Sequence, residues 1–147
     1  VHKALRLRDH GVNPHARAAA VKEWPSVDRI RLAWELASAM RFLHSGRALK
    51  NCLVLHRDVK PENVGLCGKT VKMLDFGLAV ALEQDKTDHV KCSTETKAGE
   101  SMVYDCTKET GTRRYMAPEV SRGESYGSPA DVYSFAITCW EMLALLV

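Results

Sequence analysis

The stretch LHRDVKPEN, residues 55–63, places a histidine, an arginine, an aspartate, a lysine and an asparagine within nine residues. Such a run is either a charged polar turn or the working edge of an active site, and the residues around it decide between these alternatives. An apolar run, CLVL at 52–55, leads into the stretch and predicts a short strand there.

Two further runs after the charged stretch predict a β-hairpin. NVGL at 63–66 and TVKML at 70–74 are both strand-like, and Gly68 lies in the turn between them. A tight loop followed by a hairpin brings position 75 back beside position 63. Asp75 and Asn63, two side chains with oxygen atoms, are therefore expected at one edge of the hairpin.

Helical patterns flank this region on both sides. Residues 25–46 have apolar residues at helical spacing, with Ser26 suited to cap the helix and Gly46 to end it. Asp131 is expected to begin a second helix, with Trp140 in the core. APEV at 117–120 is expected to open a short helix, and residues 82–110 to form a long polar loop. The sequence thus predicts a mainly α fold with short β-hairpins. The residues expected on the buried side of the first helix are Ile30, Ala33, Trp34, Ala37, Met40, Phe42 and Leu43.

Composition narrows the class of protein. The chain has 147 residues, of which 46% are hydrophobic and 27% charged, as in one globular domain or lobe. A net charge of +3 suits an anionic ligand, and we expect no nucleic-acid partner. The longest apolar run, residues 135–147, is shorter than the roughly 20 residues of a membrane span. Five cysteines without a C-x-x-C pair favour reduced thiols in an intracellular, cytoplasmic setting.

The polar residues after the first strand have the chemistry of phosphoryl transfer. That reaction requires a carboxylate near the attacking hydroxyl, a cation on the phosphate oxygens, and ligands for Mg²⁺. Asp58 can orient or accept a proton, and Lys60 can neutralise a phosphate. Asn63 and Asp75 can ligate a metal, because Mg²⁺ takes hard oxygen ligands and only one or two carboxylates from protein.

Four motifs in order resemble the catalytic core of eukaryotic protein kinases. They are HRDVKPEN at 56–63, DFG at 75–77, GTRRYMAPE at 111–119 and DVYSFAI at 131–137. The motifs are most similar to the tyrosine-kinase-like branch of the Ser/Thr kinases. The resemblance implies a kinase C-terminal lobe over residues 26–147, with residues 1–25 as a lead-in and an activation segment at 75–119.

The resemblance implies a role for each residue of the proposed reaction. Asp58 resembles the catalytic base, Lys60 the lysine on the transferred phosphate, and Asn63 and Asp75 the Mg²⁺ ligands. Thr112 resembles the threonine that bridges base and lysine in Ser/Thr kinases. The implied cofactors are ATP and Mg²⁺, and the implied partner is a protein substrate that presents Ser or Thr.

Other motif residues resemble structural and regulatory positions. His56 and Phe76 resemble stacked spine residues, and Asp131 the carboxylate that braces the catalytic loop. Glu119 resembles a glutamate that pairs with an arginine beyond residue 147.

Arg57 resembles the arginine that pairs with a phosphorylated activation loop. Thr107 and Thr110 are the nearest upstream hydroxyls, and a phosphate on either can pair with Arg57. The alternative is that this is an ordinary solvated loop.

The sequence also departs from the family pattern. No Gly-rich phosphate loop, strand lysine or pairing glutamate helix precedes residue 56, so we expect a partial kinase domain without its N-lobe and last helices. Gly65 stands where the family places a larger apolar residue under the adenine. Two functions therefore stay open: a Ser/Thr protein kinase, inactive as this fragment alone, and a pseudokinase or docking lobe that binds proteins. An unrelated phosphotransferase or metal hydrolase does not explain GTRRYMAPE.

Overall fold

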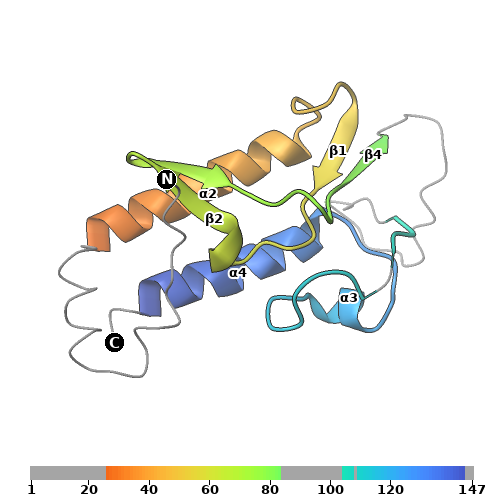
Figure 1. Cartoon of the computed structure of the whole chain (residues 1–147). Coiled ribbons are helices and arrows are strands. Elements are labelled where there is room, and N and C mark those ends of the chain that lie inside the picture. The colour runs from red at the N-terminus through yellow and green to blue at the C-terminus, as the bar shows by residue number, and fades with distance from the viewer. Residues whose placement is uncertain (1–25, 84–103, 108, 145–147) are drawn as a thin grey trace, which may run out of the picture.

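The fold is built from two long helices, two small antiparallel sheets and two short helical turns. The computed structural model describes residues 26–83, 104–107 and 109–144, and the expected lead-in at 1–25 lies outside them. Helices α2 and α4 run side by side in opposite directions, with the strands along one side of the pair (Figure 1). The elements are α2 Ser26–His44, β1 Cys52–Leu55, η2 Pro61–Asn63, β2 Val64–Cys67, β3 Thr70–Met73, β4 Val80–Glu83, α3 Pro118–Ser121 and α4 Ser128–Ala144.

The predicted hairpin is confirmed. Strands β2 and β3 pair antiparallel from Val64 opposite Met73 to Cys67 opposite Thr70, and Gly68 takes a positive φ of 62° in the turn. The Leu74 N–H donates to the Asn63 carbonyl at 2.9 Å. The chain thus returns from the hairpin directly beside the start of β2, as the strand–turn–strand pattern indicated.

A second sheet joins β1 to β4 and was not predicted. Leu55 pairs with Val80 and Cys52 with Glu83, so β4 includes two residues of the stretch that we assigned to a loop from residue 82. Strand β4 has only four residues and alternates between half-buried and exposed side chains. Its pairing with a strand almost thirty positions upstream is non-local, which a pattern read along the sequence does not reveal.

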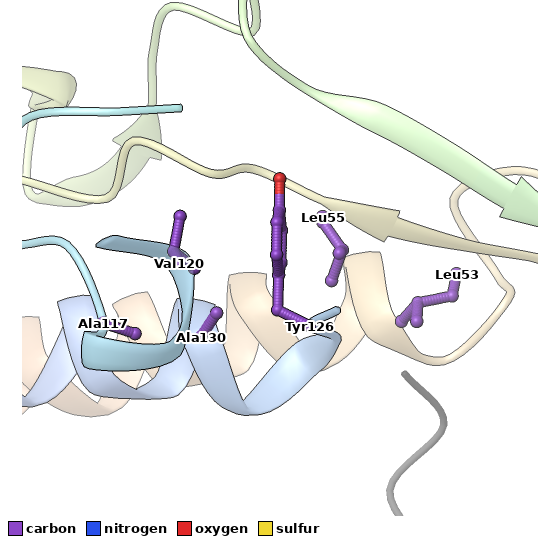
Figure 2. Close-up of a cluster of buried hydrophobic side chains, with 6 residues drawn as sticks. All are labelled: Leu53, Leu55, Ala117, Val120, Tyr126 and Ala130. Carbon is purple, nitrogen blue, oxygen red and sulfur yellow. The ribbon is translucent and has the colours of Figure 1, made fainter. Parts of the chain in front are cut away.

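Two hydrophobic clusters hold these elements together. The first joins α2, the β2–β3 hairpin and α4 through five buried residues: Leu32, Leu36, Val64, Val71 and Met142. The second, shown in Figure 2, joins β1, α3 and the start of α4 through Leu53, Leu55, Ala117, Val120, Tyr126 and Ala130. The charged loop at residues 56–63 runs from Leu55 in the second cluster to Val64 in the first, so both clusters support it.

The predicted buried face of α2 was wrong at three of its seven residues. Ile30 is 61% exposed and Trp34 69% exposed, and Phe42 is also exposed. Met40 and Leu43 are buried as predicted, and the buried stripe continues through Leu36, Leu32 and Arg29, which the prediction did not include. Two apolar stripes exist on this helix, and the hairpin and α4 pack on the one that contains an arginine.

The second helix was predicted in the right place, apart from its start and its tryptophan. Helix α4 begins at Ser128, three residues before Asp131, which lies in its first turn. Trp140, expected in the core like Trp34, is 63% exposed. The APEV segment forms the short helix α3, as expected.

The general fold class, helices with short antiparallel strands, is confirmed. The side chain of Ser26, the expected cap of α2, lies outside the described part of the structure. Cys52, Cys67, Cys106 and Cys139 are free thiols. No helix in the described ranges is long and apolar enough to cross a membrane.

Candidate active site

The first turn of α4 fixes the loop that follows β1. Asp131, which is 2% exposed, accepts the backbone N–H of His56 at its Oδ2 and that of Arg57 at its Oδ1, each at 2.8 Å. Arg57 has a positive φ of 64°, a conformation that costs about 1 kcal/mol or more in a residue other than glycine. The two hydrogen bonds to Asp131 offset that cost and set the direction of the loop.

His44 contributes to the same support and was not singled out from the sequence. It ends α2, and its Nε2 lies 2.9 Å from Asp131 Oδ2. Asp131 therefore connects the end of α2, the loop and the start of α4. The one sequence signal for this role is a histidine in the last turn of a helix, a common position for this residue. That signal does not identify Asp131, 87 positions away, as the partner.

Asp58, Lys60 and Thr112 form a closed triangle of hydrogen bonds. Lys60 Nζ donates to Asp58 Oδ2 at 2.6 Å and to Thr112 Oγ1 at 2.8 Å. Thr112 donates its backbone N–H, at 2.9 Å, and its hydroxyl, at 2.7 Å, to Asp58 Oδ1. Residues 52 positions apart in sequence thus meet at one carboxylate, and the structure brings these three predicted site residues together.

The contacts of Asp58 favour its ionised form. Burial alone raises the pKa of this carboxyl, because a low-dielectric surrounding disfavours charge. The hydrogen bonds from Lys60 and Thr112 and the positive charge of Lys60 together outweigh burial and hold the pKa of Asp58 below its ordinary value. Asp58 is therefore a carboxylate at neutral pH, able to accept a hydrogen bond from a hydroxyl.

Asn63 completes the environment of Asp58. Its Nδ2 donates to the Asp58 carbonyl at 2.9 Å and to Asp58 Oδ2 at 3.1 Å. Pro61 opens the short helix η2 that places Asn63 at this point. The amide nitrogen of Asn63 is thus used twice, and its side-chain oxygen is the atom that could bind a metal ion.

Asp75 follows Leu74, whose N–H donates to the Asn63 carbonyl at 2.9 Å, so the backbone of residue 75 lies near Asn63. Its carboxylate is exposed, and Oδ1 accepts the Gly77 N–H at 3.2 Å. Among the described residues no group of three or more His, Cys, Asp or Glu side chains can hold a metal ion. The oxygens of Asn63 and Asp75 nevertheless suit Mg²⁺, which takes one or two protein ligands and completes its shell with water or phosphate.

His56 and Phe76 pack against each other, with ring centroids 4.9 Å apart and planes tilted by 60°. His56 is fully buried, and its Nε2 donates to the Leu74 carbonyl at 3.0 Å. Its Nδ1 has no hydrogen-bond partner within the described part of the chain. Phe76 is 46% exposed, so this pair links a buried residue of the loop to the surface of the DFG segment.

Arg57 reaches the segment before Thr112 through Tyr126. Its Nε donates to the Leu78 carbonyl at 2.6 Å, and its Nη1 to the Tyr126 hydroxyl at 3.2 Å. That hydroxyl donates to the Thr107 carbonyl at 2.9 Å, which also accepts from the Thr110 hydroxyl at 3.0 Å. The three predicted regulatory residues thus lie together, but Tyr126, which joins them, was not predicted.

Glu119 forms no salt bridge with an arginine in the described part of the chain. It is half-buried in α3, and within the described residues its carboxylate forms no hydrogen bond or salt bridge. The neighbouring Tyr115 is better held, because its hydroxyl donates to Glu141 at 2.9 Å and its carbonyl accepts from Ser134 at 2.7 Å. Helix α4 thereby fixes the GTRRYMAPE segment as well as the loop.

A loop carboxylate held between a lysine and a threonine, beside a hairpin that ends in DFG, is an arrangement typical of protein kinases. The family model for the protein kinase domain matches residues 12–145. The chain belongs to the protein kinase family.

Curated relatives agree with this assignment. Serine/threonine-protein kinase VIK of Arabidopsis thaliana is 34% identical over 117 residues, which cover 78% of this chain and 23% of the relative. A protein kinase and PP2C-like domain-containing protein of the same plant is 37% identical over 133 residues, 86% of this chain and 19% of the relative. Probable serine/threonine-protein kinase drkD of Dictyostelium discoideum is 36% identical over 120 residues, 81% of this chain and 8% of the relative. The chain spans about a quarter or less of each of these relatives.

Proposed function

We propose that the chain is the catalytic-loop region, the C-terminal lobe, of a serine/threonine protein kinase. The reaction transfers the γ-phosphoryl group of MgATP to a Ser or Thr hydroxyl of a protein substrate. One observation carries the proposal: the Asp58 carboxylate, 8% exposed, is held by Lys60, Asn63 and Thr112 at once. Four groups fixed on one another in this way form a preorganised acceptor rather than a polar turn.

Each residue of this group has a role in the proposal. Asp58 accepts the hydrogen bond of the substrate hydroxyl and orients it for attack. Lys60, already 2.6 Å from Asp58, offers its charge to the phosphate oxygens. Asn63 and Asp75 would hold Mg²⁺, which neutralises phosphate charge when bound.

The choice of Ser and Thr as acceptors rests on Lys60 and Thr112. Their hydrogen bond, at 2.8 Å, leaves the Asp58 carboxylate between them. The names of the relatives, which include several serine/threonine-protein kinases, support this choice of substrate. The tyrosine-kinase-like branch is supported by the resemblance of the motifs.

Phosphorylation of Thr107 or Thr110 would regulate this site through Arg57. The Thr107 carbonyl is one hydrogen bond away from the Tyr126 hydroxyl, which Arg57 contacts. The side chain of Thr107 is exposed and accessible to a modifying enzyme. A phosphate added there could form charge-assisted hydrogen bonds with Arg57.

A second candidate function is a docking lobe or pseudokinase without catalysis. Gly65 supports it, because this buried position of β2 offers no side chain to pack against a nucleotide base. The well-formed hydrogen bonds of Asp58 favour the enzyme instead. Calorimetry can measure whether the 147-residue chain alone binds MgATP. We expect this binding to be weak or undetectable. Clear micromolar binding would contradict this expectation.

The decisive experiment replaces the proposed base in the full-length protein that contains this chain. We expect Asp58→Asn to lower phosphorylation of a generic Ser/Thr substrate by at least about 10³-fold, within the range for losing a general base. Asp28→Asn, in the first turn of α2, is the control and should keep wild-type activity. Equal activity of Asp58→Asn and Asp28→Asn would remove Asp58 from the mechanism.

A further inference from the structure

Gly111 lies where the segment before Thr112 approaches the catalytic loop most closely. Its φ is +113°, a backbone conformation that residues with a side chain rarely adopt. A Cβ at this position would lie 2.4 Å from the carbonyl oxygen of Arg57 and 3.8 Å from Asp58 Oδ1. Favourable non-bonded contacts need about 3.5 Å, so any side chain at residue 111 would push the two segments apart.

The obstacle would be backbone, not a movable side chain. The Arg57 carbonyl belongs to a loop whose neighbouring N–H groups are held by Asp131 at 2.8 Å. The loop therefore cannot move away cheaply, and the segment at residues 111–112 would have to yield. The next group along that segment is the Thr112 N–H, which donates to Asp58 Oδ1 at 2.9 Å.

We infer that Gly111 is a positioning residue for phosphoryl transfer: its missing side chain lets Thr112 reach Asp58 and hold the carboxylate. The inference rests on the proposed kinase function only for its catalytic consequence. The contact between residues 111 and 57 and the hydrogen bonds of Thr112 belong to the fold itself and can be tested without any activity.

Gly68 provides a matched control within the same chain. It also has a positive φ, 62°, but a Cβ there would meet no heavy atom within 4 Å. Gly111→Ala and Gly68→Ala therefore both place an alanine at positive φ, and the backbone cost is the higher one at residue 111, whose φ lies outside the left-handed region. Only Gly111→Ala adds the collision with the catalytic loop.

The first measurement is amide hydrogen exchange of Thr112 in the 147-residue chain, followed residue by residue by NMR. In Gly111→Ala we expect the Thr112 amide to exchange on the order of tenfold faster, because its bond to Asp58 is lost. In Gly68→Ala the exchange rate of Thr112 should equal that of the wild-type chain. Unchanged Thr112 exchange in Gly111→Ala overturns the inference.

The second measurement separates kcat from KM in the full-length protein. We expect Gly111→Ala to lower kcat on the order of 100-fold, as a misplaced catalytic group does. KM should stay within about threefold, because substrate binding itself is untouched. In a Thr112→Ala background, Gly111→Ala should lower kcat by less than about threefold more, since both changes act on one contact.

Other outcomes are equally decisive. Equal kcat losses in Gly111→Ala and Gly68→Ala, or additive losses with Thr112→Ala, overturn the positioning role. So does an unfolding midpoint of Gly111→Ala more than about 8 °C below that of Gly68→Ala, because a general loss of stability then explains the effect. A wild-type protein that transfers no phosphate would overturn the proposed function, while Thr112 exchange would still decide the role of Gly111.

Discussion

The two halves of the candidate site are held in different ways. In the catalytic-loop half, residues 56–63, Asp58 is 8% exposed and bonded to Lys60, Asn63 and Thr112. In the DFG half, residues 75–78, Asp75 is exposed and accepts one hydrogen bond, from Gly77. Both halves contain a residue at positive φ, Arg57 and Asp75, but only the first is tied down by a buried carboxylate.

This difference indicates a division of labour in the proposed reaction. The group that orients the hydroxyl is preorganised by the fold and needs no ligand to take its place. The DFG half has few buried contacts, as is common for segments that rearrange around a ligand. We expect the first half to contribute to stability and the second half to contribute little, which four substitutions can test.

Removal of the Asp131 side chain should have the largest effect. Asp131→Ala leaves two loop N–H groups without their acceptor and His44 without its partner. Each unsatisfied buried donor costs roughly 1–3 kcal/mol, so we expect a loss of about 4 kcal/mol in the free energy of unfolding, measured by urea titration. Asp105→Ala, at an exposed aspartate, is the control and should change stability by less than about 0.5 kcal/mol. Similar losses in both variants would mean that the loop is not braced by α4.

Tyr126→Phe should have an intermediate effect. The change removes the hydroxyl that accepts from Arg57 at 3.2 Å and donates to Thr107 at 2.9 Å, but keeps the ring in the second cluster (Figure 2). Loss of these bonds should cost about 1–2 kcal/mol in the free energy of unfolding.

The matched control for Tyr126→Phe is Tyr133→Phe, at a tyrosine that is 41% exposed. Its free energy of unfolding should stay within about 0.5 kcal/mol of the wild-type value. If both variants are equally stable, Tyr126 does not join the loop to the segment at Thr107.

Most of the candidate site could be predicted from residues that are close together in the sequence. The HRDVKPEN run, the hairpin with Gly68 and the short helix α3 depend on neighbours in the chain, and the structure has the hairpin and α3 where the sequence predicted them. Thr112 was assigned only through the family resemblance, because its contact with Asp58 spans 54 positions.

Non-local packing accounts for what the sequence did not predict. Which stripe of α2 is buried depends on the hairpin and α4, and the buried stripe includes Arg29, so hydrophobic periodicity favoured the wrong side with Trp34. Strand β4 exists through its pairing with β1. His44 and Tyr126 act through partners 87 and 69 positions away, Asp131 and Arg57, and no spacing rule connects such pairs.

Substitution in the DFG half should have the smallest effect on stability, and its comparison with the catalytic-loop half is the most direct. Asp58→Asn and Asp75→Asn make the same chemical change, one in each half. Asp58→Asn weakens charge-assisted bonds from Lys60 and Thr112 and should cost about 2 kcal/mol in the free energy of unfolding. Asp75→Asn loses little, because its carboxylate is exposed and an amide oxygen can still accept from Gly77, so we expect a change below about 0.5 kcal/mol.

Urea titrations of the two variants in the absence of Mg²⁺ and nucleotide make this comparison directly. A loss for Asp75→Asn as large as that for Asp58→Asn would show that the DFG half is also fixed before any ligand binds. With the expected ordering, Asp58, the carboxylate proposed to orient the hydroxyl, contributes more to the stability of the fold than Asp75 does. The proposed metal ligand would then be positioned mainly by the ion that it binds.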